Sequence, residues 1–406
     1  MAVNRSTHSL GLLWFVALLS LPALTTARAE MGPPVRIGYA VSASGPAAAG
    51  TAITTAPNYR LWVRSVNREG GLRLPDGSRR LISVIEYDDR SDPQELARAI
   101  ERLALVDEVD FILPPWGTSA NFAVAPLLDR FGYPHLCVTC TSDRIDEHVV
   151  HWPRSFWFLG EGRDYADALA ELLADARDDG RIGDKVAMVS VADGFGVELA
   201  ASAREAFAAN GLGLVQDETY PPGTRDFGAM IAAAAASGAD TFVAMSYPPD
   251  TFALTAEARR SGYSPKVFYT GVGAAFPAYP RANANDVEGV TSLGGVENGA
   301  TMRDYFTRHA ELIGSPPDSW ASAPTWASLQ ILRQAIERRG LDREAVSREI
   351  SRGRFETVLG DVQLENNQLR DLWRVGQWQD GRFVGVAPRS RPGAAELRVP
   401  GPEWGP

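Results

Sequence analysis

Two neighbouring hydroxyl side chains, Thr118 and Ser119, stand at a point of the sequence where ligand-binding chemistry is expected. Residues 111–121 run from an apolar stretch through two prolines, a Trp and a Gly into an apolar-rich segment. This order predicts a strand, a tight turn and the start of a helix. Because the first N–H groups of a helix lack intrahelical partners and favour negative charge, we expect this turn to face a small acidic ligand.

No motif in the sequence predicts catalysis: the nucleophile-elbow, phosphate-loop and zinc-helix patterns are all missing. Gly194, Gly196 and Ala200 resemble a dinucleotide fingerprint, but a close-packed turn between strand and helix explains them more simply. Asp88, Asp89 and Asp92 follow a strand and are expected to cap or anchor the next helix. We therefore expect no enzyme activity, no cofactor and no metal ion.

Cys137 and Cys140 are the two cysteines of the chain. The β-branched residues between them indicate a strand rather than the helix start of a thioredoxin-like pair. Two small buried residues at a strand end are the simplest interpretation. A disulfide, and a metal or redox site that recruits nearby histidines such as His135, are the alternatives.

The N-terminus has the features of a secretory signal peptide. Arg5 precedes a nearly unbroken apolar run at residues 10–24, and Ala27-Arg-Ala29 forms a small-x-small cleavage site. Residues 1–29 are therefore predicted to be removed on export to the periplasm. A membrane anchor is the alternative, but the run is short for a span of about 20 residues.

The overall composition is that of a globular protein with more than one core. The chain has 406 residues, 45% hydrophobic and 22% charged, which suits two lobes better than one. The net charge of −10 argues against a nucleic-acid partner.

Strand and helix patterns alternate in two series of similar size, which predicts an α/β fold with two doubly wound lobes. We expect the chain to cross between them through a multi-strand hinge. Residues 51–68 are expected to be helical despite Pro57 near the start, and Pro126 is expected to kink the helix after the opening turn or delay its start. The predicted boundaries are residues 35–155 with 289–365 for lobe 1, residues 156–288 with 366–389 for lobe 2, and an irregular tail at 390–406.

Short motifs along the chain, taken in order, carry a family resemblance. They include Ser-Gly-Pro at 44–46 with Gly50, Asp-Asp at 88–89 with Asp92, Asp-Gly-Phe-Gly at 193–196, residues 222–227 and Gly-Val-Gly at 271–273. Together they resemble type I periplasmic solute-binding proteins, in particular the branched-chain amino-acid-binding family of ABC importers. The resemblance covers residues 35–386 and implies two lobes that close over a small ligand.

The resemblance also implies which residues touch that ligand. In this family, hydroxyls and backbone N–H groups of the first lobe hold the ligand carboxylate, and aromatic residues of the second lobe cover it. The matching positions in this sequence are Trp116, Thr118, Ser119, Cys140, Thr141, Phe195, Tyr247 and Thr270.

Two of these positions depart from the family pattern. Thr270 is neutral where amino-acid binders usually carry an acidic partner for the ligand ammonium, and an unpaired buried charge is costly. Trp116 is bulky where a small residue is usual, and small residues around Ala49 replace a common Tyr. We therefore expect the ligand to be a carboxylate or amide with an apolar or aromatic body. Its pocket would be lined by Trp116, Phe195, Tyr247 and Phe276.

The function that follows is that of a monomeric solute receptor for an ABC importer. It would deliver its ligand to inner-membrane permease subunits, with ATP hydrolysis on separate subunits. A sensory binding protein of the same fold is the first alternative, and an exported enzyme is the second.

Overall fold

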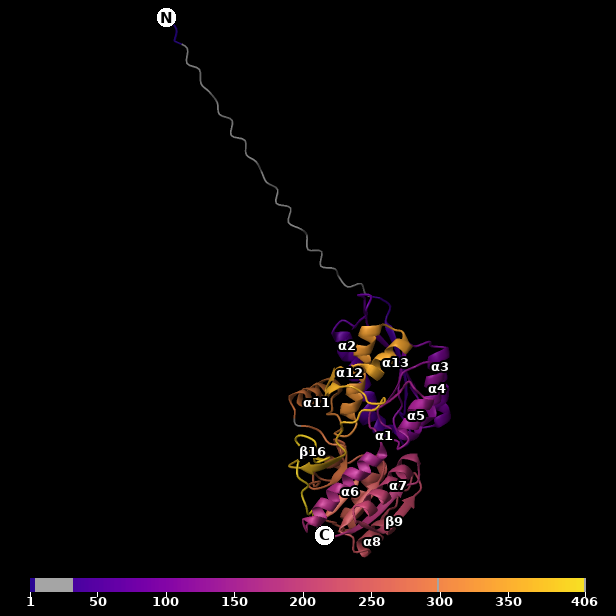
Figure 1. The fold of residues 1–406 in the computed structure, drawn as a ribbon, viewed down its shortest axis with the longest axis vertical. Coiled ribbons are helices and arrows are strands. Elements are labelled where there is room, and N and C mark those ends of the chain that lie inside the picture. Colours follow the sequence, from indigo (N-terminus) through magenta and orange to yellow (C-terminus); the bar gives the residue numbers. More distant parts are fainter. Residues whose placement is uncertain (4–31, 298, 405–406) are drawn as a thin grey trace.

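The computed structural model describes residues 1–3, 32–297 and 299–404 and consists of two lobes stacked along the long axis (Figure 1). The predicted signal peptide, residues 1–29, lies outside the described residues except for its first three. In the described part of the chain, no helix combines the length and apolar character needed to cross a membrane.

The first lobe is built on parallel strands covered by helices on both faces. The side chains of β1 alternate between two hydrophobic clusters, Ile37 and Tyr39 on one face and Ala40 on the other, as the two-residue period of a strand requires. The sheet order is β4-β1-β5, and β6 pairs in parallel with β7. These strands are β1 (Val35–Val41), β4 (Ile82–Asp88), β5 (Phe111–Leu113), β6 (His135–Cys137) and β7 (Ser155–Trp157).

The helices of this lobe come from both ends of the chain. In Figure 1 the indigo α2 lies beside the orange α12 and α13, which return from the C-terminal part of the sequence. α12 is buried along most of its length and packs on α2, so the late segment completes the first core. The helices are α2 (Ala56–Arg68), α3 (Pro93–Leu105), α4 (Thr118–Arg130), α5 (Ile145–His151), α11 (Ala300–Ile313), α12 (Ser322–Arg339) and α13 (Arg343–Arg352). Two small hairpins join them, β2 (Leu72–Arg73) with β3 (Arg79–Arg80) and β13 (Phe355–Thr357) with β14 (Gly360–Val362).

The second lobe contains a seven-stranded sheet with the order β16-β15-β12-β11-β10-β8-β9. Its first five strands along the chain are mutually parallel, and the β15–β16 hairpin adds an antiparallel edge. β12 lies in this sheet, although it follows residue 289, where the predicted first lobe resumes. The strands are β8 (Lys185–Val191), β9 (Gly213–Tyr220), β10 (Thr241–Met245), β11 (Val267–Thr270), β12 (Thr291–Leu293), β15 (Val375–Gln379) and β16 (Arg382–Ala387). The helices are α6 (Gly162–Asp178), α7 (Gly194–Ala209), α8 (Gly228–Ala236), α9 (Pro248–Ser261) and α10 (Ala278–Ala282).

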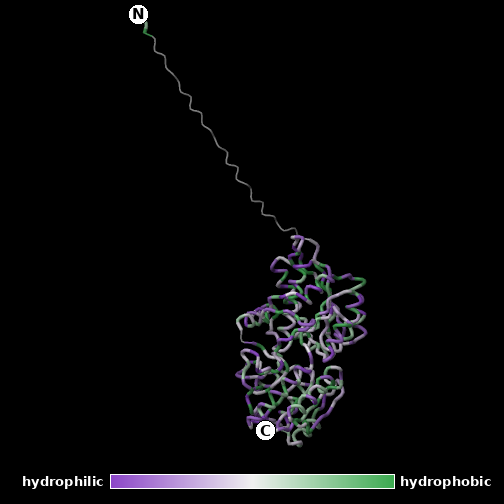
Figure 2. Tube along the Cα trace, in the orientation of Figure 1, coloured by the Kyte–Doolittle hydropathy of each residue, from purple (hydrophilic) through white to green (hydrophobic). Residues whose placement is uncertain are grey.

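Connecting segments between the lobes lie side by side. The buried guanidinium of Arg374, ahead of β15, donates to the Leu159 carbonyl at 2.8 Å and bonds to Asp164 at 2.6 Å, both beyond β7. These bonds tie two crossings into one hinge. Figure 2 shows green, hydrophobic stretches running through both lobes, in keeping with a separate core on each side of this hinge.

Two predicted helices can be compared with the structure. Residues 51–68 are helical as expected, although the helix starts earlier, with α1 (Ala48–Gly50), and passes through a π-helical turn η1 (Thr51–Thr55) before α2. α4 does not start late, because it begins at Thr118 and continues through Pro126. Pro126 lies on the exposed side of the helix, where water can satisfy the carbonyl that loses its N–H partner.

Candidate functional site

A cavity of about 560 Å³ lies between the lobes, at the carboxyl ends of their parallel strands. This is where open α/β sheets bind ligands, because the turns that follow the strands meet there. The first lobe contributes the turns after β1, β4 and β5, and the second lobe those after β8, β9 and β10. The lining includes Ser42, Ala47, Asp89, Trp116, Gly117, Ser119, Ala120, Asp193, Arg225, Tyr247 and Asp250.

The first-lobe wall is the N-terminus of α4. Gly117 is its N-cap residue, with φ 96° and ψ 151°, a conformation that L side chains rarely adopt. Its own N–H donates to Thr139 Oγ1 at 2.9 Å, and no side chain caps the helix. Thr118 and Ser119 therefore occupy the first turn rather than the cap. The turn presents backbone N–H groups that the helix leaves unpaired, as expected for an anion-binding start.

Trp116 precedes this turn and reaches the second lobe. Its indole is 5% exposed and belongs to the hydrophobic cluster of the second lobe. The ring centroid lies 5.7 Å from that of Tyr247 and 6.5 Å from that of Trp320. A Cβ on Gly50 would come within 2.2 Å of the indole, so only glycine allows this approach. Trp116 thus fills the inner end of the space between the lobes.

Hydrogen bonds from Asn121 fix the backbone on both sides of Trp116. The side-chain amide of Asn121 donates to the carbonyls of Pro115 and Gly117, at 3.0 and 2.8 Å, on either side of Trp116. The Asn121 oxygen lies 2.9 Å from Nε2 of the buried His135. Burial lowers the pKa of His135 to about 3, so the ring is neutral and can donate to this oxygen.

The second-lobe wall is aromatic and acidic. Tyr247 stacks on Phe195 of α7 at 5.0 Å, and burial followed by the nearby Asp193 carboxylate raises the pKa of Tyr247 well above its usual value. Burial also raises the pKa of Asp250, which accepts from Tyr220 and from the Tyr247 N–H. Asp193 caps α7 through the Gly196 N–H at 3.0 Å. These acids support the turns and also give this wall a negative charge.

A buried carboxyl group on the first-lobe side adds to that charge. Asp89 accepts from the Ser42 hydroxyl at 2.6 Å and the Ser91 N–H at 2.8 Å, and burial raises its pKa. Arg225, on the exposed turn after β9, is the basic side chain of the lining. The cavity therefore combines helix N–H groups and one arginine with several acidic side chains.

The lobes touch one another beside the cavity. Glu198 of α7 accepts from the Ser142 hydroxyl at 3.0 Å and from the Asp143 N–H at 2.8 Å, both in the first lobe. Asp143 in turn accepts from the Arg163 N–H at 2.6 Å, at the start of α6. The two lobes are therefore in direct contact beside the cavity.

The predicted site residues divide into two groups in the structure. Trp116, Ser119 and Tyr247 line the cavity, and Phe195 supports it by stacking on Tyr247. Thr118, Cys140, Thr141 and Thr270 are buried and do not line it. Phe276, which the predicted ligand pocket included, is also buried outside the lining.

No ligand role was predicted for Asp89, Asp193, Asp250 or Arg225. Three of them lie on segments that follow a strand, and Asp250 lies in the first turn of α9. For those three, the position after a strand was the available signal. Asp89, Asp193 and Arg225 lie within motifs that carry the resemblance, and Asp250 closely follows Tyr247. Their positions beside the cavity could therefore have been inferred.

The two cysteines are joined in a disulfide, with Cα atoms 5.7 Å apart, a usual separation for such a bond. The two residues are buried at the end of β6, as the simplest interpretation expected, but they are bonded, so the disulfide alternative is the one that the structure has. Among the described residues, no three His, Cys, Asp or Glu side chains gather as ligands for a metal ion.

Comparisons with known proteins agree on the fold. A family model described as periplasmic binding protein matches residues 34–382. The Leu/Ile/Val-binding protein homolog 7 of Brucella abortus is 23% identical over 404 residues, covering 94% of this chain and 98% of that protein.

Solved structures give the same result. The substrate binding protein LivJ of Streptococcus pneumoniae, in complex with isoleucine, has a TM-score of 0.74 at 18% identity and covers 90% of this chain and 100% of its own. A solute binding protein of an ABC transporter from R. palustris, in complex with benzoate, has a TM-score of 0.74 at 17% identity, covering 91% and 97%. At these identities the likeness shows the fold, two lobes of the type I periplasmic binding protein class.

Proposed function

This chain belongs to the periplasmic binding protein family, and we propose that it captures a small carboxylate between its lobes and delivers it to a membrane permease. The observation that carries the proposal is the cavity between the lobes, where the N-terminus of α4 faces the aromatic pair formed by Trp116 and Tyr247. The relatives are named for binding Leu, Ile and Val, and two structural neighbours hold isoleucine and benzoate. The signal-peptide pattern supports export to the periplasm.

The carboxylate would bind at the first turn of α4. Backbone N–H groups there attract negative charge, and the Ser119 hydroxyl adds a donor beside them. The indole nitrogen of Trp116 is buried, and it has no acceptor among the described residues. A ligand oxygen that enters before the lobes close could accept from this nitrogen, which would otherwise remain unpaired at a cost.

The body of the ligand would be apolar or aromatic and would carry no second negative charge. Trp116 and Tyr247 offer ring faces for it, and such contacts add about 0.5–1.5 kcal/mol beyond burial. Asp193 and Asp250 face the same space, so a second carboxylate would meet like charge in a partly dry site. A neutral amide or an ammonium at that end would be accepted instead.

The transport step follows from closure. The ligand would bind one lobe first, and contacts with the other lobe would then favour the closed form by differential affinity. The bonds from Ser142 and Asp143 to Glu198 form only when the lobes meet, so they would stabilise the form that a permease recognises. ATP hydrolysis would occur on separate subunits, and the receptor itself would act as a monomer without a cofactor.

A thermal-shift panel on the mature chain tests the proposal, using benzoate, L-leucine, benzamide and terephthalate. A ligand at a hundred times its dissociation constant stabilises the folded protein by about 2.7 kcal/mol, which raises the unfolding temperature by several degrees. We expect such a shift from a monocarboxylate and none from terephthalate, which matches benzoate in shape and adds a second charge. If terephthalate binds as tightly as benzoate, the charge argument is wrong. If no carboxylate or amide in an enlarged panel binds, the ligand class is wrong.

A further inference from the structure

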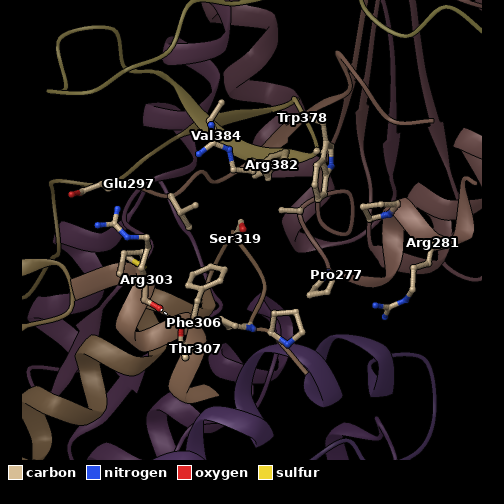
Figure 3. A pocket seen from close by; sticks show the side chains of 18 residues that line it. Pro277, Arg281, Glu297, Arg303, Phe306, Thr307, Ser319, Trp378, Arg382 and Val384 are labelled. Carbon is tan, nitrogen blue, oxygen red and sulfur yellow. Dashed lines mark hydrogen bonds between the residues drawn. The ribbon is translucent and has the colours of Figure 1, made fainter. Parts of the chain in front are cut away.

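A second cavity, of about 540 Å³, has a lining separate from that of the cleft (Figure 3). Ser319 lines this second cavity, while the next residue, Trp320, contacts Trp116 in the cleft at 6.5 Å. The two cavities share no lining residue. They are therefore separate spaces, divided by the chain between α11 and α12.

Both lobes contribute walls to this cavity. Phe306 comes from α11, which packs on α2 of the first lobe. Trp378 and Phe383 come from the β15–β16 hairpin at the edge of the second sheet. In Figure 3 Phe306 and Ser319 lie near the middle, with Trp378 on the opposite wall from Phe306. A molecule bound there would touch both lobes at once.

The interior of the second cavity is apolar. Trp378 is largely buried and its indole N–H is already donated to the Ala274 carbonyl at 2.9 Å, so it offers a ring face rather than a polar group. Phe306 is half-buried and presents its ring from the other side. A cavity of this size with facing aromatic walls suits a flat organic body.

The rim of the second cavity is positive, although the protein as a whole carries a net charge of −10. Arg281, Arg303 and Arg382 stand around it, on α10, α11 and β16 respectively, with Arg303 and Arg281 on opposite sides in Figure 3. The exposed guanidinium groups of Arg281 and Arg382, from two elements, favour an anion by charge and by bidentate hydrogen bonding.

The acidic groups nearby are engaged elsewhere. Glu297, the acid of the lining, bonds to the buried Arg391 at 2.5 Å. Asp380, in the turn between β15 and β16, is held by Arg398 at 2.6 Å. Among the described residues, no acidic side chain forms an ion pair with Arg281 or Arg382. These two guanidinium groups are thus available to a ligand.

We propose that this cavity is a second ligand site, which takes a small organic anion with one acidic group on a flat apolar body. The ring faces of Phe306 and Trp378 hold the body, and the positive charge of Arg281 and Arg382, on different sides of the rim, attracts the acidic group. This inference stands independently of what the cleft binds, because the two cavities share no residue.

The test is fluorescence titration of the full mature chain with two matched probes. 8-Anilinonaphthalene-1-sulfonate is a flat aromatic anion, and N-phenyl-1-naphthylamine is its uncharged counterpart. The double substitution Arg281→Gln with Arg382→Gln is expected to weaken binding of the sulfonate at least tenfold while leaving binding of the neutral probe within twofold. Unchanged binding of the neutral probe also shows that the variant is folded.

A control removes the same charge elsewhere. Arg68 and Arg352 are exposed and line neither cavity, so Arg68→Gln with Arg352→Gln should leave both probes unaffected. Phe306→Ala should weaken both probes, because it removes one wall. The proposal is overturned if the Arg281/Arg382 variant binds the sulfonate as tightly as the natural chain, if the control variant weakens it equally, or if Phe306→Ala changes neither probe.

Discussion

The indole of Trp116 lies 5.7 Å from the ring of Tyr247, centroid to centroid, so an aromatic residue of the first lobe packs directly on one of the second. Trp116 also joins the hydrophobic cluster of the second lobe, although it follows a strand of the first. One side chain therefore does two things, because it forms a wall of the cleft and part of the contact between lobes. Ligand choice and lobe closure are expected to depend on it together.

Trp116→Ala is expected to change the ligand profile. Removing the indole opens the inner end of the cleft and takes away a ring face, so the acid that gives the largest thermal shift should bind at least tenfold more weakly. A larger acid such as 2-naphthoate should lose least, because it can fill the vacated space. Isothermal calorimetry measures both, with Trp152→Ala, in the first lobe and outside the cavity lining, as the control. An unchanged profile would show that Trp116 does not set ligand choice.

Gly50→Ala is expected to displace the Trp116 indole. The added methyl would come within 2.2 Å of the Trp116 indole, so the ring must move. Overpacking of this kind costs about 1–3 kcal/mol, and displacement of the indole should also lower ligand affinity. Thermal unfolding and calorimetry give the two effects. Gly299→Ala is the control, since nothing lies within 4 Å of its added methyl, and an equal effect there would contradict the proposed clash.

Asn121→Ala is expected to release the turn that carries Trp116. Its amide spans the carbonyls of Pro115 and Gly117, and its loss leaves both without this donor, at a cost of about 1–3 kcal/mol. Ligand affinity should fall as well, because the indole is no longer fixed. Asn283→Ala is the matched control: it removes a buried amide bonded to the Tyr279 carbonyl at 2.9 Å, away from the cleft. Loss of affinity in both variants would point to general destabilisation instead.

Much of the fold could be predicted, because alternating strand and helix patterns report directly on parallel sheets. The pattern of a strand followed by a tight turn likewise indicated the turn of Trp116 and Ser119, and the resemblance supplied Tyr247. All three line the cavity, and their contact with a ligand stays a prediction. Thr270 was placed by resemblance alone, and the structure buries its hydroxyl in β11 without a partner among the described residues. Contacts between segments that lie far apart in the sequence leave no pattern in either segment, so they could not be predicted.

The irregular tail illustrates this limit of sequence reasoning. Residues 390–404 form no helix or strand, as their Gly and Pro content indicates. Even so, Trp404 packs edge-on against Phe268 of β11 at 4.8 Å. The Gly401 N–H also donates to the Lys266 carbonyl, which precedes that strand. Only the folded structure shows that this segment packs against the sheet of the second lobe.

The buried His135 predicts a loss of stability in mild acid. Burial lowers its folded pKa to about 3, whereas its ordinary value is 6.5, so the unfolded chain takes up the proton first. Its contribution is unchanged above pH 7 and becomes increasingly unfavourable as the pH falls through 6.5 towards 3. Between pH 7 and pH 5 the expected cost is about 2 kcal/mol, from the linkage between protonation and folding.

His135→Gln isolates this effect from the titration of other groups. Glutamine can still donate to Asn121 but cannot take up the proton, so the variant should lose about 2 kcal/mol less than the natural chain between pH 7 and pH 5. Unfolding followed at both pH values measures the difference. His151→Gln, at an exposed histidine on α5, is the control and should keep the pH dependence of the natural chain. Equal pH dependence in all three proteins would mean that His135 does not resist protonation in the folded state, and its bond to Asn121 would then need another explanation.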